Sequence, residues 1–323
     1  MEESRPLAAI DVGSNTIHLV IARPAPGARD LEYLADELEL IRIGADVSAT
    51  GAIGPERMAR AIAVIRTQAE RAHALSAATV LGIATEGIRA ASNATAFIER
   101  VATETGVRLQ IISGEQEAAL TYWGATSGAN HADTQRAVVD LGGGSLEVVV
   151  GRGSAVLWRV SLPLGSGALH DQFTPTDPPG DAELEAAGEF VTETLHSLIP
   201  PLPVTEGIAC GGTATTLAGL SLRLSGPEEP GATRLRLLTR ERMADALTLM
   251  RTLSASALAG RFHFEEDRAR ILPAGTVALQ RTAEWLGLDG LRVTGRGIRE
   301  GAILAYAHKG DAWPELAQSG AGW

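Results

Sequence analysis

The chain has 323 residues, about the length of two domains, and its hydrophobic content of 45% is ample for two cores. A formal net charge of −11 argues against a nucleic-acid-binding protein, which needs a basic face, but leaves phosphate substrates open because a few local donors can bind them. Cys210 is the only cysteine, which excludes an internal disulfide and a metal cluster held by thiolates.

The first part of the chain alternates between strand-like and helix-like patterns. In the helix that Pro55 opens, Ile62 and Ile65 fall on one face, and Asn93 is a favoured N-cap for the next helix. The first predicted elements are strands at 7–23 and about 30–43, a Gly-rich loop at 44–54 and a helix from residue 55. A strand at 78–84, a loop that carries Arg89 and a helix at 94–104 follow. The last are a strand at 107–113 and a helix that begins in the acidic turn 113–117 and ends at about 125. This order predicts an α/β domain with a mixed sheet.

The second part repeats the alternation after a small and polar stretch at 124–133, which we predict to be a hinge. The predicted strands cover 136–141, 146–151, 155–162, 206–210 and 290–294, a loop covers 174–181, and helices cover about 181–198, the residues that follow 211, 239–253, 271–287 and about 298–308. Residues after Gly310 show no periodicity, so we expect a frayed tail at 311–323.

The N-terminal residues do not resemble a targeting segment. Residues 1–5 are acidic and lack the apolar region of a signal peptide, and no apolar run in the chain reaches transmembrane length. We therefore expect a cytoplasmic protein that contacts neither a membrane nor a nucleic acid.

The most informative stretch is a β-branched strand, the turn Gly142–Ser145 and a second β-branched strand. Successive glycines without Cβ atoms let the backbone adopt positive φ and let a bulky group approach it. Consecutive N–H groups in such a turn form a concavity that binds anions. Asp140 and Glu147 flank the turn, and carboxylates beside an anion indicate a cation between them. We therefore predict a phosphate and a divalent metal at this turn.

The same pattern occurs near the N-terminus, where the turn Gly13–Asn15 lies between two apolar strands. Aligned without gaps, Asp11 corresponds to Asp140 and Thr16 to Ser145. Either stretch alone is also compatible with an ordinary hairpin that has a glycine-rich turn. Two such stretches at a domain-sized separation favour two copies of one domain, with their loops facing each other across a cleft.

Eight short stretches spread over about 7–308 carry a further pattern: Asp11-Val-Gly-Ser-Asn-Thr-Ile-His18, Arg42-Ile-Gly44, Ala84-Thr-Glu-Gly-Ile-Arg89 with Asn93, Ile111-Ile-Ser-Gly-Glu-Gln-Glu117-Ala, Val139-Asp-Leu-Gly-Gly-Gly-Ser-Leu-Glu147, Gly211-Gly-Thr213, Arg270-Ile-Leu-Pro-Ala-Gly275 and Gly297-Ile-Arg-Glu-Gly301. In this order they resemble the exopolyphosphatase / guanosine-pentaphosphate phosphohydrolase (Ppx/GppA) family, within the actin-like and sugar-kinase superfamily. Leu146 stands where the family usually has Thr, and Gly211 where Ser is more frequent.

The resemblance implies an α/β fold of two actin-like (ribonuclease H-like) domains, each with a mixed β-sheet flanked by helices, and a cleft between them. It places domain I at 1–123 and domain II at 124–298, with the helix at 299–310 packing back on domain I. Longer family members carry extra C-terminal helical domains, so the resemblance is to a short two-domain form, for which we expect a preference for short polyphosphate chains.

The resemblance also implies hydrolysis of a terminal phosphoanhydride with Mg²⁺ or Mn²⁺. Glu117 matches the family's catalytic glutamate and would act as general base, with Glu115 as the alternative. Arg89 would bind phosphoryl oxygens as a bidentate clamp. From the residues alone, both acids could instead complement the dipole of a helix start, and Arg89 could be an ordinary surface arginine.

Three glycine turns and three carboxylates complete the predicted site. His18, which corresponds to Glu147, is expected to be a satisfied core histidine, and Cys210 a buried small hydrophobe. For the acids, the alternative is that an aspartate at a strand end caps the turn. Phosphate would be bound by Gly13, Ser14 and Asn15 and by Gly142, Gly143, Gly144 and Ser145. A base or a further phosphate would be bound by Gly211, Gly212 and Thr213, and metal by Asp140 and Glu147 ahead of Asp11.

Four functions remain open at this point. The first is an exopolyphosphatase acting on inorganic polyphosphate, and the second is a pppGpp 5′-phosphohydrolase of the same family. The third is a kinase of the superfamily, although the sequence shows no sugar- or acid-binding signature. The fourth is a non-catalytic nucleotide sensor, which the presence of the acids disfavours. A homodimer is compatible with the sequence, which does not locate its face.

Overall fold

The structure, a computed structural model, describes residues 5–27, 29–128, 134–201, 203–225 and 236–323. It divides into two units, one of residues 1–130 and 296–323 and the other of residues 131–295. Each unit is an α/β body with its own mixed sheet and its own hydrophobic core, so we describe the two units separately.

The first unit is built on a five-stranded sheet. Its elements are β1 (Leu7–Val12), β2 (Thr16–Pro24), β3 (Leu31–Leu40), α1 (Ile43–Thr50), α2 (Pro55–Ala74), β4 (Val80–Ala84), α3 (Glu86–Arg89), α4 (Ala94–Thr105), β5 (Leu109–Ile111), α5 (Gly114–Thr126), α12 (Ile298–Lys309), the 3-10 helix η1 (Gly310–Ala312) and α13 (Trp313–Ser319). The strand order is β3-β2-β1-β4-β5, in which β1, β2 and β3 form an antiparallel meander and β4 and β5 run parallel to β1.

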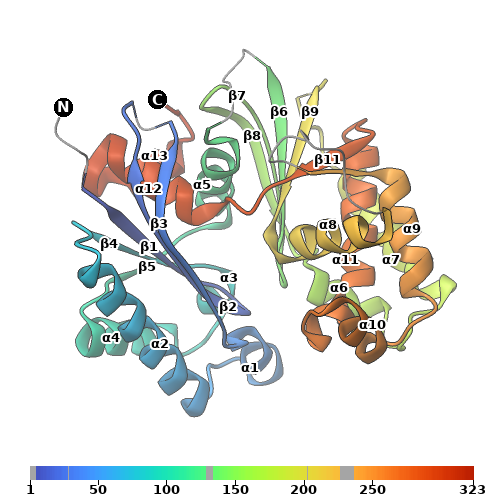
Figure 1. Cartoon of the computed structure of the whole chain (residues 1–323), viewed down its shortest axis with the longest axis horizontal. Coiled ribbons are helices and arrows are strands. Elements are labelled where there is room, and N and C mark those ends of the chain that lie inside the picture. Colours follow the sequence, from blue (N-terminus) through green and yellow to red (C-terminus); the bar gives the residue numbers. More distant parts are fainter. Residues whose placement is uncertain (1–4, 28, 129–133, 202, 226–235) are drawn as a thin grey trace. The chain divides into compact units, whose positions relative to one another are not determined.

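Helices cover both faces of this sheet (Figure 1). On one face α2 and α4 pack against the strands, and Met58, Ile62 and Ile65 of α2 are buried there, as their helical spacing predicts. On the other face α12 contacts β1 and β2, and α5 packs on α12. The sheet is therefore buried on both sides, which explains why its central strands β1 and β2 are almost entirely apolar.

The second unit is built on a six-stranded sheet. Its elements are β6 (Gln135–Leu141), β7 (Leu146–Arg152), β8 (Ala155–Leu162), α6 (Ser166–Phe173), α7 (Asp181–His196), β9 (Glu206–Cys210), α8 (Gly211–Ser225), β10 (Arg236–Thr239), α9 (Arg240–Met250), α10 (Ala255–Phe262), α11 (Glu266–Trp285) and β11 (Gly290–Val293). The strand order is β10-β11-β9-β6-β7-β8, with an antiparallel meander β6-β7-β8 and with β9 parallel to both β6 and β11.

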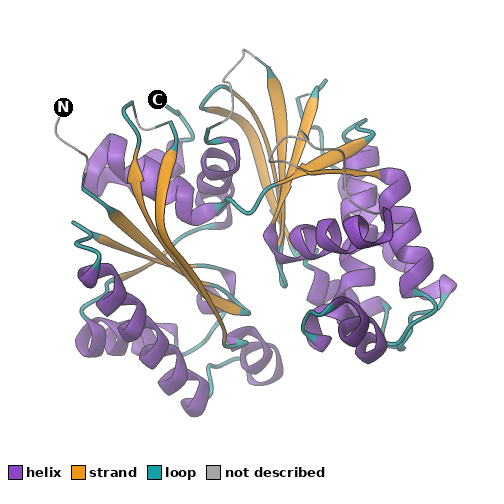
Figure 2. Ribbon diagram, viewed as in Figure 1, coloured by secondary structure: helices purple, strands orange, loops and turns teal. Residues whose placement is uncertain are grey.

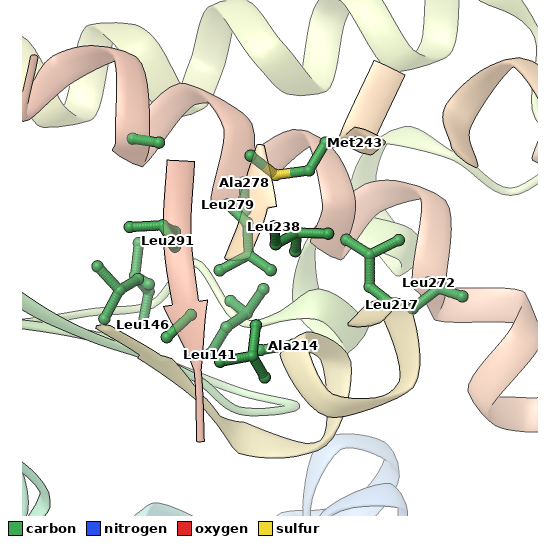
Figure 3. Packing of buried hydrophobic residues seen from close by; sticks show 14 of the residues in the cluster. Leu141, Leu146, Ala214, Leu217, Leu238, Met243, Leu272, Ala278, Leu279 and Leu291 are labelled. Carbon is green, nitrogen blue, oxygen red and sulfur yellow. The ribbon is translucent and has the colours of Figure 1, made fainter. Parts of the chain in front are cut away.

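The helices of the second unit gather on one face of its sheet (Figure 2). Between helices and sheet lies a core to which β6, β7, α8, α9 and α11 contribute (Figure 3). Leu141 and Leu146, at the two ends of the glycine turn, are buried in this core together with Leu217 of α8. The turn is therefore anchored to the core by the apolar residues on either side of it.

The two sheets share one topology, because each begins with a three-stranded meander and continues with two strands parallel to its first strand; the second sheet adds the antiparallel edge strand β10. This confirms the predicted fold class of two α/β domains with mixed sheets flanked by helices. No helix in the described part of the chain has both the length and the apolar character needed to cross a bilayer.

Several short elements were predicted wrongly. Residues 44–54 were expected to be a loop, but most of them belong to α1, where Ile43 is buried and the Gly44 N–H donates to the Ser14 carbonyl at 2.7 Å. Arg89 ends the short helix α3 and does not lie in a loop, and α6, α10 and β10 were not predicted. The expected tail at 311–323 contains α13, in which Trp313 is buried. These short helices depend on contacts with distant residues, which local periodicity does not report.

The predicted hinge at 124–133 overlaps α5, because residues 124–126 form the last turn of that helix. Residues 129–133 of the predicted hinge lie outside the described residues.

Candidate active site

The N-terminal turn is a tight hairpin between β1 and β2. Asp11 and His18 are paired across the two strands, and the Gly13 N–H donates to the Thr16 carbonyl at 3.0 Å. The Ser14 hydroxyl donates to a carboxylate oxygen of Glu86 at 2.9 Å. The turn is thereby fixed to the start of α3, the helix that Arg89 ends.

The turn between β6 and β7 has the same geometry. Asp140 and Glu147 are paired across the strands, and the Gly142 N–H donates to the Ser145 carbonyl at 3.0 Å. The pairing of two acids here and of an acid with His18 in the first unit is the correspondence that the ungapped alignment predicts.

The carbonyl groups of Gly142, Gly143 and Gly144 are bound from one side, by backbone N–H groups at the start of α6. Because a trans peptide group points its C=O and N–H in opposite directions, the N–H groups of residues 143–145 point away from α6. Within the described part of the chain, the N–H groups of Gly143 and Gly144 have no hydrogen-bond partner. The bonds that orient the turn are Gly165 N–H to Gly144 O at 3.1 Å, Ser166 N–H to Gly142 O at 2.9 Å and Gly167 N–H to Gly143 O at 2.9 Å.

The first turn is oriented in the same way by residues before and inside α1. The Ser14 carbonyl accepts from Gly44, and the Asn15 carbonyl accepts from the N–H groups of Ile41 and Arg42, both at 2.9 Å. By the same peptide geometry, the N–H groups that follow these carbonyls point away from α1. Each turn therefore presents consecutive N–H groups on one side, which is the arrangement that binds anions.

The prediction of positive φ in the second turn is wrong. None of the described glycines Gly142, Gly143 and Gly144 has positive φ. Glycine is needed here because two backbones approach each other closely: a Cβ on Gly165 would lie 2.3 Å from the carbonyl carbon of Gly144. Close packing of the α6 start, and not an unusual backbone conformation, explains the small residues at this turn.

Glu117 and Arg89 are brought together in the first unit. Ser113 caps α5, which places Glu117 in its first turn, and the Glu117 side chain is 14% exposed. Arg89 Nη1 donates to the Ile112 carbonyl at 2.6 Å and lies 3.9 Å from Glu117 Oε2. Glu115, the alternative base, is exposed. Of the two carboxylates, that of Glu117 is therefore the less exposed and the one that lies near Arg89.

The predicted metal ligands Asp140 and Glu147 lie side by side on β6 and β7. Glu147 is buried, and its Oε1 accepts from the Ser161 hydroxyl at 2.6 Å. Two neighbouring carboxylates fit Mg²⁺, which commonly takes one or two protein carboxylates and completes its shell with water and phosphate oxygens. Among the described residues, no group of three or more His, Cys, Asp or Glu side chains could hold a metal ion without such additional ligands.

Asp11 lies in a different setting. His18, its partner across the strands, forms an ion pair with Asp36 of β3. The hydrogen bond from His18 is the main cause that lowers the pKa of Asp36 from its ordinary value. The His18 side chain is 14% exposed and is partnered by a carboxylate, so it is satisfied, as predicted.

The third glycine turn supports the second one. Gly211 has a φ of 89°, and a Cβ there would lie 2.5 Å from the Leu141 carbonyl oxygen. Thr213 is fully buried; its hydroxyl donates to Ser166 Oγ at 3.2 Å, and the Ser166 hydroxyl donates to the Gly142 carbonyl at 3.1 Å. The Thr213 side chain therefore holds the turn Gly142–Ser145 in place. Cys210 is buried beside this turn, as predicted.

Arg268 is a residue of this region that was not predicted. A Cβ on Gly212 would lie 2.6 Å from an Nη atom of Arg268, so the guanidinium lies against the start of α8. Burial lowers the pKa of Arg268 from its ordinary value. The sequence pattern placed the start of α11 at 271, whereas the helix begins at Glu266. A helix prediction that included residues 266–270 would have shown Arg268 as a candidate anion ligand.

Comparison with known proteins identifies the family of the chain. The sequence model of the Ppx/GppA phosphatase family matches residues 20–310. A member of the Ppx/GppA family from Aquifex aeolicus is 30% identical, covers 95% of this chain and 99% of its own, and superposes with a TM-score of 0.82. An exopolyphosphatase-like protein is 26% identical, with 94% and 98% coverage and a TM-score of 0.82.

A further structure, an exopolyphosphatase from Cytophaga hutchinsonii, shares the fold with a TM-score of 0.83 at 20% identity, covering 94% of this chain and 98% of its own. The family match extends over most of the chain and includes the second turn, Glu117 and Arg89. The chain therefore belongs to the Ppx/GppA phosphatase family.

Proposed function

We propose that this phosphatase is an exopolyphosphatase that removes the terminal phosphate of inorganic polyphosphate, with Mg²⁺ or Mn²⁺ and with Glu117 as general base. The observation that carries the proposal is that each unit has a hairpin turn whose consecutive N–H groups point to one side of that turn. Two acids, Asp140 and Glu147, flank the second turn, and Asp11 flanks the first together with His18. Each such turn can bind one phosphate group, so the presence of two turns supports a substrate with more than one phosphate, whereas a phosphatase for small monoesters needs only one.

The proposed reaction is an attack by water on the terminal phosphorus. A new P–O bond forms to the water oxygen, the bridging P–O bond to the rest of the chain breaks, and the bridging oxygen leaves with the shortened polyphosphate. Glu117 takes the proton that water loses, and orthophosphate is released. Catalysis of this kind consists mainly of positioning and of neutralising charge, because the phosphoryl transition state is loose.

Arg89 and Arg268 are the proposed cationic ligands of the phosphate oxygens, one in each unit. Arg89 uses Nη1 for the Ile112 carbonyl, so its remaining N–H groups can donate to a phosphoryl oxygen. Arg268 belongs to α11 and lies against the start of α8, where the helix dipole also favours an anion.

Asp140 and Glu147 are the proposed metal ligands, and Asp11 is a weaker candidate. A divalent ion bound between the carboxylates and the phosphate would neutralise charge on the phosphoryl oxygens. The name of the 26% identical neighbour, an exopolyphosphatase-like protein, supports polyphosphate over other phosphoanhydrides.

One assay separates this proposal from its competitors. Phosphate release is measured in parallel from short polyphosphate, long polyphosphate, pppGpp and ATP, each with Mg²⁺, with Mn²⁺ and with EDTA. We expect release from polyphosphate that EDTA abolishes and either metal restores. Fastest phosphate release from pppGpp would identify a pppGpp 5′-phosphohydrolase instead. Absence of phosphate release from all four substrates would favour a non-catalytic nucleotide sensor.

A further inference from the structure

The C-terminal residues pack against the helix that carries Glu117. α13 lies along α5 and α12, with Trp313 buried in the contact (Figure 1). Beyond α13, the ring of Trp323 lies 4.9 Å from that of Trp123 on α5 and stacks on His308 of α12 at 4.2 Å. The segment 313–323 therefore holds α5 near both its first and its last turns.

The side-chain amide of Gln116 links this segment to the start of α5. Gln116 Oε1 accepts from the Ser113 N–H at 2.8 Å, and the Gln116 N–H donates to Ser113 Oγ at 3.2 Å, which is a complete capping box. The NH₂ group of the same side chain donates to the Pro314 carbonyl at 3.0 Å. The Gln116 side chain thus joins the helix cap to α13.

The backbone held in this way is the one that orients Glu117. The Glu117 N–H donates to the Ser113 carbonyl at 2.9 Å, so the capping residue fixes the turn on which Glu117 stands. On the other side, Arg89 holds the Ile112 carbonyl directly before the cap. Residues 112–117 are therefore restrained from one side by Arg89 and from the other by α13.

We infer that Gln116 is a positioning residue for Glu117, and that the segment 313–323 supplies the anchor through which it acts. The inference rests on the proposed role of Glu117 as general base. A capping box accepts Glu or Gln equally well, but only an amide can also donate to a carbonyl. Position 116 therefore requires a hydrogen-bond donor for the Pro314 carbonyl in addition to the acceptor that the capping box needs.

The test compares Gln116→Ala, which removes both contacts, with Gln116→Glu, which keeps the acceptor of the capping box but loses the donor to Pro314. We expect both to lower kcat by about 10- to 100-fold with KM changed less than about twofold, because misplacing a catalytic group by roughly 1 Å has effects of this size. The matched control is Glu183→Ala at the start of α7, where the Glu183 carboxylate accepts from the N–H of the N-cap residue Gly180 at 2.7 Å. It should lower the thermal midpoint and leave kcat unchanged.

A second measurement shows whether Gln116 acts through Glu117. In a Glu117→Gln background, Gln116→Ala should have no further effect on kcat, since coupled residues are not additive. A full additional loss in that background would overturn the inference, as would normal kcat in Gln116→Glu. Normal turnover of Glu117→Gln alone would instead overturn the proposed base.

Hydrogen exchange provides a readout that does not depend on activity. The amides of residues 113–118 should exchange faster in Gln116→Ala and in a chain that ends at residue 312, and the two changes should not add when combined. Unchanged protection in Gln116→Ala would overturn the inference even if the shortened chain failed to fold.

Discussion

At the scale of single residues, Glu115 and Glu117 stand two positions apart in the first turn of α5, but their surroundings differ. Glu115 is exposed, whereas the Glu117 side chain is 14% exposed and lies 3.9 Å from Arg89. An acid that merely complements the helix dipole needs no such neighbour. The cation beside Glu117 can hold a phosphoryl group within reach of the water that Glu117 would deprotonate.

Replacing Glu117 by Gln, which has nearly the same shape, should lower kcat by about 10²–10⁴ because the amide cannot accept a proton from water. KM should change little, since the turns that are proposed to bind phosphate remain intact. Steady-state kinetics on the best substrate measure both constants. The comparison variant is Glu115→Gln: if the large loss occurs there and not at 117, Glu115 is the base.

Residue identities at the site were predicted better than residue roles. Asp140 and Glu147 stand opposite each other, as the ungapped alignment indicates. Thr213, by contrast, was expected to touch substrate, yet its side chain is buried against Ser166. Spacing along the chain reveals which residues belong to a turn, but the direction of a side chain depends on contacts such as Ser166 to Gly142, which come from distant positions.

At the scale of elements, α5 and α12 cross with their backbones in contact. A Cβ on Gly124 would lie 1.8 Å from the Gly297 carbonyl oxygen, and one on Gly301 would lie 1.8 Å from the Leu120 carbonyl oxygen. No side chain can occupy either position without separating the helices. This crossing fixes α5, and with it Glu117, to the rest of the first unit.

We therefore expect Gly301→Ala to destabilise the protein by about 3 kcal/mol or more, because overpacking against a backbone cannot be relieved by a change of rotamer. The matching fall in the thermal midpoint is roughly 6–12 °C. The control is Gly260→Ala in α10, where an added Cβ would meet nothing within 4 Å. There the helix propensity of Ala should leave stability unchanged or raise it by about 0.5–1 kcal/mol. Equal midpoints for the two variants would contradict the close crossing.

The long elements follow from sequence patterns, and the short ones do not. α2 runs from Pro55 to Ala74 with its apolar face on the sheet, as periodicity predicts. α1 and α6 have eight residues each and begin with glycine-rich turns, so their sequences alone indicate loops. N–H groups at or just before their starts donate to carbonyls of the turns at residues 13–15 and 142–145. The feature that orients the candidate site thus lies in the elements that local patterns predict least well.

At the scale of the whole molecule, a strongly acidic protein is proposed to act on a polyanion. The net charge of −11 repels any part of a polyphosphate chain that extends beyond the groups bound by the turns and arginines. A short polyphosphate chain would have most of its negative charge at the N–H groups of the turns and at the arginines. A long chain would have most of its negative charge outside these groups, where the acidic protein repels it. Electrostatics therefore favours short substrates.

We expect kcat/KM at low salt to be higher for chains of a few phosphates than for chains of roughly a hundred. The difference should shrink between about 0.01 M and about 0.15 M salt, because the Debye length falls from about 30 Å to about 8 Å and screens the distant charges more than the bound ones. Assays with size-selected polyphosphates at constant free Mg²⁺ measure the ratio. A kcat/KM that rises steadily with chain length at low salt would show that attraction to the long chain outweighs the repulsion, and would contradict the expected preference.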